Sequence, residues 1–196
     1  HELTIKIRQL FVHKLSYFAA GQITPLVIYG YMTLTDVTRY ENYMILVWGG
    51  LSLTNAVFNG LMASVGNLVV SESADKIYSV FKELFSVRFW FASCLCFAIF
   101  FFGTPLVRLW IGPSFELPSS SLLLIDLILF IQITRNNADS FLFAYQLVRD
   151  IWAPLVEFGI NISLSLWLGY YYGLDGILTG FLISLIIIPL LWKAYY

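Results

Sequence analysis

"FWFASCLCFAIFFFGTPLVRLWI", residues Phe89–Ile111, is a long and almost wholly apolar run with a single charged residue, Arg108. A helix needs about 20 mainly apolar residues to cross the hydrocarbon core of a bilayer. The run therefore predicts a transmembrane helix, and the rest of the chain can be compared with it.

The overall composition favours the same setting. Of the 196 residues, 59% are hydrophobic and only 12% are charged, and the mean hydropathy is +0.80. Soluble domains carry about 25% charged residues, because their surfaces face water. Lipid solvates apolar side chains, so a membrane protein has no such need. The composition predicts an all-α membrane protein.

Six segments are long and apolar enough to span a bilayer, and together they form one transmembrane domain over residues 1–196. They cover approximately residues 10–34, 43–70, 89–111, 120–145, 154–172 and 176–192. Between the second and third segments, residues 72–87 place their apolar side chains on one helical face: Ile77, Val80, Phe81, Leu84 and Phe85. We expect a short amphipathic helix at the membrane interface there, or alternatively a helix packed on other parts of the protein.

Basic residues favour one orientation of these spans. With the N-terminus in the cytoplasm, eight of the eleven lysine and arginine residues lie inside, namely Lys6, Arg8, Lys14, Lys76, Lys82, Arg88, Arg149 and Lys193. Arg39 and Arg108 lie outside, and Arg135 lies within a span. Cytoplasmic loops carry the excess of basic residues, so we expect both termini in the cytoplasm.

Several functional classes have no signature in the sequence. The net charge of −1 gives no electrostatic case for nucleic acid. The chain has no nucleotide-binding loop, dinucleotide glycine fingerprint or zinc-binding helix motif. Cys94 and Cys96 do not have the spacing of a metal or redox pair. We expect no enzymatic activity, no catalytic residue, no cofactor and no metal.

The fourth predicted span carries polar side chains near its centre. One helical face holds Gln132, Arg135, Asn136 and Asp139, at i, i+3, i+4 and i+7. A charged group at mid-bilayer costs about 2.5–3.5 kcal/mol, so this face should meet other helices or water rather than lipid. A purely structural alternative is that Arg135 neutralises Asp139, or pairs with Glu157 across helices.

Two other predicted spans carry polar stripes. These are Ser52, Asn55 and Asn59 in the second span, and Glu157, Asn161 and Ser165 in the fifth. Three stripes on three helices favour a shared, hydrated interior that serves a substrate or an ion. Small residues also recur every four positions, at Gly176, Gly180 and Ser184 and at Ala56 and Gly60. Such spacing predicts close approach of helix backbones.

Several stretches together carry a family resemblance. They read "HKLSYF" (13–18), "YENYMIL" (40–46), "FNGLMASVGNLVV" (58–70), "VFKELFSVRFW" (80–90), "PLVRLWIG" (105–112), "RDIWAPLVEFGINISLSLWLGYYYGLDGILTGFLIS" (149–184) and "WKAYY" (192–196). In this order and spacing, the chain resembles the polysaccharide-transporter branch of the multidrug/oligosaccharidyl-lipid/polysaccharide exporter superfamily, the flippases of O-antigen and capsule repeat units.

The resemblance implies an architecture and an activity. Family members have two six-helix lobes, and this chain is similar to the second, so the N-terminal lobe is an expected partner. Such proteins move undecaprenyl-diphosphate-linked oligosaccharides between the leaflets of the bacterial cytoplasmic membrane by alternating access. The implied localisation is therefore the bacterial inner membrane, with lipid-linked oligosaccharide and membrane lipid as partners.

The resemblance also suggests roles for the polar residues. Arg135 is expected to contact the diphosphate, because sugar-diphosphate recognition needs positive charge and hydrogen-bond donors. The remaining expected substrate contacts are Asn55, Asn59, Gln132, Asn136 and Asn161, and the candidates for coupling a proton or cation are Asp139 and Glu157. Two alternatives remain open: a cation-coupled drug exporter of the same superfamily, and a membrane assembly protein whose polar stripes only hold helices together.

Overall fold

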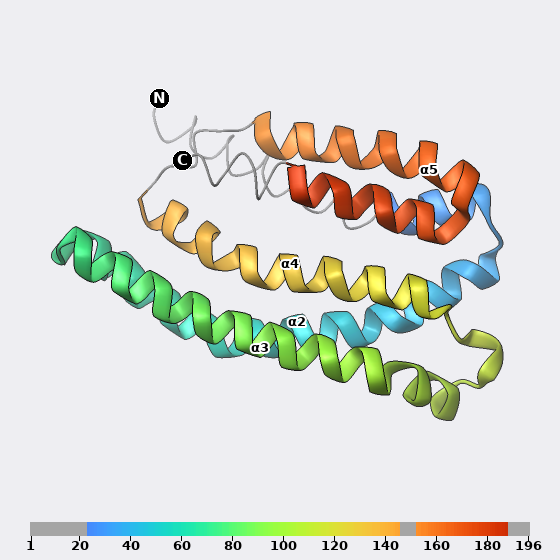
Figure 1. Ribbon diagram of the computed structural model, residues 1–196, viewed down its shortest axis with the longest axis horizontal. Helices are drawn as coiled ribbons and strands as arrows, with labels where there is room; N and C mark the ends of the chain where they lie inside the picture. Colours follow the sequence, from blue (N-terminus) through green and yellow to red (C-terminus); the bar gives the residue numbers. More distant parts are fainter. Residues whose placement is uncertain (1–22, 146–151, 188–196) are drawn as a thin grey trace. The chain divides into compact units, whose positions relative to one another are not determined.

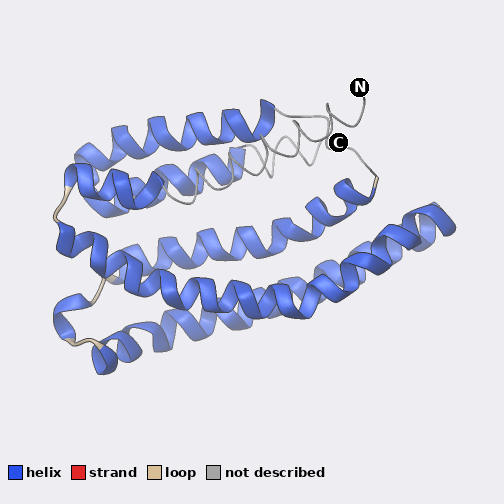
Figure 2. Cartoon of the chain, turned by 180° about the vertical axis from the view of Figure 1, so that it is seen from behind, coloured by secondary structure: helices blue, strands red, loops and turns tan. Residues whose placement is uncertain are grey.

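The computed structural model describes residues 23–145 and 152–187, and regular structure in these ranges is helical throughout (Figure 1). Residues 23–31 are helical, and the elements that follow are α2 (Leu34–Ser71), α3 (Ala74–Trp110), the 3-10 turn η1 (Pro113–Phe115), α4 (Ser119–Ala144) and α5 (Trp152–Leu185). Figure 2 shows these helices joined by short loops, with no strand in the described residues. The all-α prediction is confirmed for this part of the chain.

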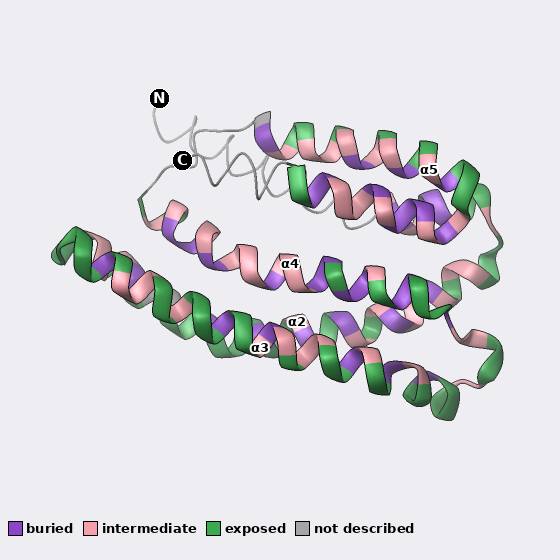
Figure 3. Cartoon of the chain, in the orientation of Figure 1, coloured by how far each residue is buried: buried purple, intermediate pink, exposed green. Residues whose placement is uncertain are grey.

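Three of these helices, α2, α3 and α4, are long and apolar enough to cross a membrane. Much of the surface of α3 is both apolar and exposed (Figure 3). Its exposed side chains include Phe89, Trp90, Phe97, Phe101, Phe102, Leu106 and Leu109. Soluble proteins rarely expose an apolar surface of this extent, whereas lipid solvates it readily. These features are compatible with a membrane protein.

The predicted second, third and fourth spans lie within α2, α3 and α4 to within a residue. The structure differs at the predicted interfacial helix, 72–87, which is not a separate element. It forms the first part of α3, which continues without a break from Ala74 to Trp110. No glycine or proline occurs between Ala74 and Phe102, so the helix has no residue that would end it.

Helix α2 begins at Leu34, earlier than the second span was predicted to begin. Thr33 and Asp36 form a capping box there: the backbone N–H of Asp36 donates to Thr33 Oγ1 at 3.3 Å, and that of Thr33 donates to Asp36 Oδ2 at 3.1 Å. Arg39 Nη1 lies 3.0 Å from Asp36 Oδ1. A carboxylate also suits the positive end of the helix dipole, so this short motif starts the helix.

The described residues divide into two compact units. The first holds residues 23–41, 118–124 and 152–187, and the second holds residues 42–117 and 125–145. In the first unit α5 doubles back on itself at Gly173 (Figure 1), where φ is 58° and ψ is −134°. Positive φ favours glycine. The two arms of this hairpin correspond to the predicted segments 154–172 and 176–192, of which residues 188–192 lie outside the described range.

The two arms of the α5 hairpin approach each other closely at two glycines. A Cβ atom built on Gly176 would lie 2.1 Å from the carbonyl oxygen of Leu168, and one on Gly180 would lie 2.5 Å from the backbone nitrogen of Ser165. Neither contact could be tolerated. The predicted backbone approach is therefore confirmed at Gly176 and Gly180, but it is not found at Gly60, where nothing lies within 4 Å.

In the second unit, α2, α3 and α4 pack side by side with neighbours antiparallel (Figure 1). At one end the Tyr43 hydroxyl lies 3.1 Å from Thr104 Oγ1 and accepts a hydrogen bond from the backbone N–H of Leu117 at 3.3 Å. At the other end Val65 and Phe141 pack with Ile77 in a buried apolar cluster. These contacts link α2 and α3 to the loop before α4 at one end, and all three helices at the other.

The loop from α3 to α4 is held by an exposed ion pair. Arg108 donates two hydrogen bonds to Glu116, and Nη2 and Oε2 are 2.9 Å apart. This hydrogen bonding lowers the pKa of Glu116 below its ordinary value. The lowered pKa keeps the carboxylate ionised through neutral and moderately acidic pH, and so preserves the loop contact there.

Candidate functional site

The polar face of α4 contains a nearly buried ion pair. Arg135 Nε lies 3.1 Å from Asp139 Oδ2, and the two side chains are 7% and 16% exposed. The spacing i, i+4 predicts this pairing, which is the structural alternative raised from the sequence. The positive charge expected to contact a diphosphate is thus already balanced by a neighbouring carboxylate.

The other polar groups of α4 are partly engaged in the helix packing. Asn136 and Gln132 are half-buried. Asn137, at 1% exposure, donates from Nδ2 to the carbonyl oxygen of Phe81 at 3.4 Å. The Ser140 hydroxyl donates to the carbonyl oxygen of Asn136 at 2.6 Å. Asn137 therefore faces α3 rather than open solvent.

The polar stripe of α2 is exposed along its length. Ser52, Asn55 and Asn59 are all exposed in the structure. An amide side chain in hydrocarbon cannot satisfy its hydrogen bonds, and this costs free energy. In a membrane protein the stripe must therefore face water or other polar groups.

Of the eight residues predicted to contact substrate or couple an ion, Glu157 and Asn161 lie on α5 and belong to the first unit. The other six lie on α2 and α4 and belong to the second unit. Asn161 is 1% exposed and accepts a hydrogen bond at Oδ1 from Ser165 Oγ at 3.0 Å. Ser165 Oγ also lies 3.0 Å from the carbonyl oxygen of Ile177, in the other arm of the hairpin. Asn161 therefore serves the hairpin interior in this structure, and Glu157 is half-buried on the same arm.

A buried arginine is the main feature that the sequence analysis missed. The charge count placed Arg88 on the cytoplasmic side and gave it no further role, whereas the structure shows it inside α3 and 5% exposed. Its guanidinium carbon lies 4.4 Å from the centre of the Phe58 ring. The sequence does contain a pattern that indicates burial, because Arg88 continues the apolar face of Ile77, Phe81 and Leu84 at helical spacing.

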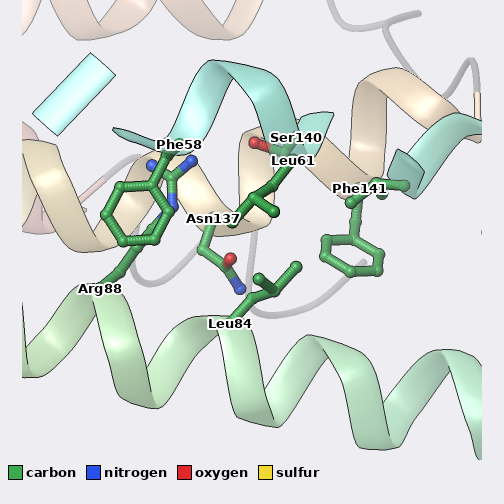
Figure 4. A pocket seen from close by; sticks show the side chains of 8 residues that line it. Phe58, Leu61, Leu84, Arg88, Asn137, Ser140 and Phe141 are labelled. Atoms are coloured by element: carbon green, nitrogen blue, oxygen red, sulfur yellow. The ribbon is translucent and has the colours of Figure 1, made fainter. Parts of the chain in front are cut away.

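Arg88 lines a small pocket between the helices of the second unit (Figure 4). The other lining residues are Phe58, Leu61, Val65, Leu84, Asn137, Ser140 and Phe141. The space inside it is about 10 Å³, which is room for about one water-sized group. Sites for small molecules usually measure about 300–1,000 Å³, so the pocket is far too small for an oligosaccharide. None of the residues predicted to contact substrate lines it.

A buried carboxyl group is the second feature that the sequence did not single out. Asp126 of α4 is 4% exposed, and neither of its carboxyl oxygens has a hydrogen-bond partner. The Cys96 thiol donates to the backbone oxygen of Asp126 at 3.4 Å. Helical spacing alone does not show that Asp126 lies against α3. An ionised carboxylate is costly in such a position.

No protein-family model, no curated protein and no solved structure matches the chain. The functional interpretation of these residues therefore rests on their chemistry and on the family resemblance described above.

Proposed function

We propose that the chain is one lobe of a flippase that moves lipid-linked oligosaccharides across the bacterial cytoplasmic membrane. In this proposal six segments cross the membrane: the three long apolar helices, the two arms of α5, and the segment 10–34. Both ends of the lobe lie in the cytoplasm, and a second lobe completes the transport pathway by alternating access. The substrate class is undecaprenyl-diphosphate-linked sugar.

The exposed stripe of Ser52, Asn55 and Asn59 is the observation that carries this proposal. It lies on α2, a helix long and apolar enough to cross a membrane. Because hydrocarbon cannot solvate amides, the stripe favours a hydrated space within the membrane. A space lined by amides suits hydroxyl-rich sugars better than apolar drug cations, since amides both donate and accept hydrogen bonds.

The ion pair on α4 supports the same proposal. Ionisable residues inside membrane-spanning helices commonly mark substrate or ion pathways. Arg135 can exchange part of its contact with Asp139 for a substrate diphosphate, because a guanidinium has five N–H donors. The release of Asp139 during that exchange would give the carboxyl a role in coupling.

The direct test is flipping in proteoliposomes that contain the native protein. A fluorescent undecaprenyl-diphosphate oligosaccharide should become accessible on the opposite leaflet faster than in protein-free vesicles. A cationic dye should not be moved. Movement of the dye alone would favour a drug exporter, and movement of neither would favour an assembly protein.

In the same vesicles we expect Glu157→Gln to remove the dependence of flipping on a proton or sodium gradient. Glutamine has nearly the same shape but cannot bind and release a proton, nor carry the charge that a cation needs. The measurement is the flipping rate with and without each gradient. Glu72→Gln, the same change at an exposed position between α2 and α3, should respond to gradients as the wild type does. An unchanged gradient response in Glu157→Gln would remove this residue from the coupling step.

A further inference from the structure

The side chain of Arg88 is buried without a carboxylate partner among the described residues. It is 5% exposed, and its Nε atom has no hydrogen-bond partner. None of the ion pairs among the described residues includes it. An arginine remains protonated under all ordinary conditions, so it cannot avoid the cost of burial by losing its proton.

The immediate surroundings of Arg88 compensate this charge only in part. The face of the Phe58 ring attracts the guanidinium. Among the residues that line the pocket, none is a carboxylate. Buried charges are normally paired, so the pocket has an excess positive charge that an anion would balance.

The pocket is suited to a small anionic group. Figure 4 shows Arg88 rising from α3 alongside the Phe58 ring, with Asn137 and Ser140 nearby on α4. The Asn137 amide uses one N–H for the carbonyl oxygen of Phe81, which leaves its second N–H as a donor. The limited space excludes a sugar and leaves room at the open mouth for a chloride-sized ion or for one oxygen of a phosphate.

We propose that the Arg88 pocket binds a small anionic group as the counter-charge of this arginine. The group is either a free anion, such as chloride or phosphate, or the phosphate of a membrane lipid, because each can place one negatively charged atom beside a guanidinium. The inference does not depend on the substrate proposed above, since none of the expected substrate contacts lines this pocket.

The test compares thermal unfolding of the wild type and Arg88→Met. The proteins are first purified in a non-ionic detergent with sodium gluconate, and chloride or phosphate then replaces gluconate at constant ionic strength. In a second experiment, the Tm is compared between nanodiscs of phosphatidylcholine and nanodiscs that also contain phosphatidylglycerol. We expect the anion to raise the wild-type Tm by about 5–10 °C at a hundred times its Kd, and to leave Arg88→Met unchanged.

Two control variants make the result specific. Lys82→Met removes a positive charge from an exposed position of the same helix and should keep the full anion response. Arg88→Lys keeps the buried charge and should keep a response, even if Arg88→Met fails to fold.

A shift with chloride or phosphate identifies a free anion, and a shift only with phosphatidylglycerol identifies a lipid phosphate. Equal shifts in the wild type and Arg88→Met, or no shift in the wild type in either experiment, would overturn the proposal.

Discussion

Replacing both members of the α4 ion pair, as in Arg135→Met/Asp139→Leu, should leave a folded protein that flips lipid-linked oligosaccharide at least tenfold more slowly. Exchanging a buried ion pair for apolar side chains is often neutral or stabilising. A charge-assisted hydrogen bond to the diphosphate contributes about 1.5–3 kcal/mol, which corresponds to roughly 10- to 100-fold in rate or affinity. The measurements are the Tm of the purified variant and its flipping rate in proteoliposomes.

The single variant Arg135→Met is the necessary comparison. It removes the arginine that pairs with the nearly buried Asp139, so we expect a loss of about 3 kcal/mol in folding stability. A slow single variant alone would therefore not separate transport from folding. If the stable double variant flips substrate at the wild-type rate, the pair is purely structural and the assembly-protein alternative gains support.

A second large effect is expected in the α5 hairpin. Gly176→Ala should lower the free energy of unfolding by about 3 kcal/mol, because the added Cβ would lie 2.1 Å from the carbonyl oxygen of Leu168. Both atoms belong to backbone-fixed positions, so the two arms must separate to relieve the clash. Thermal unfolding in detergent measures the effect as a lowered Tm.

Gly159→Ala is the matched control on the same helix. Nothing lies within 4 Å of a Cβ atom at Gly159. Alanine has a higher helix propensity than glycine, by about 1 kcal/mol, so this variant should be as stable as the wild type or slightly more stable. Equal stability of Gly176→Ala and Gly159→Ala would show that the arms do not pack as described.

The sequence predicts most of what is local in this fold. Long apolar runs locate α2, α3 and α4, and the break at Gly173 separates the arms of α5. Pairs four residues apart, such as Arg135 with Asp139, follow from helical geometry. Residues 74–87 were predicted as a separate helix because their pattern is amphipathic, whereas the pattern after them is uniformly apolar. Nothing in the sequence interrupts the helix, and the structure shows that α3 continues through both.

Contacts between distant parts of the chain could not be predicted. The hydroxyl of Tyr43 reaches the backbone of Leu117, and Arg88 lies over the ring of Phe58 on another helix. Helical spacing places Arg88 on the inner face of α3, but it does not say whether a carboxylate or an aromatic ring lies opposite. That choice depends on how neighbouring helices are aligned, which periodicity leaves open.

The proposed hydrated pathway is tested most directly by the solvent that each face of α2 meets. Asn59 and Val57 are both exposed in the structure, but they point to different sides of the helix. In a variant without Cys94 and Cys96, a membrane-impermeant maleimide is applied to intact membranes containing either Asn59→Cys or Val57→Cys. We expect labelling of Asn59→Cys and protection of Val57→Cys by lipid. Labelling of both positions would contradict the membrane setting, and protection of both would contradict a hydrated pathway.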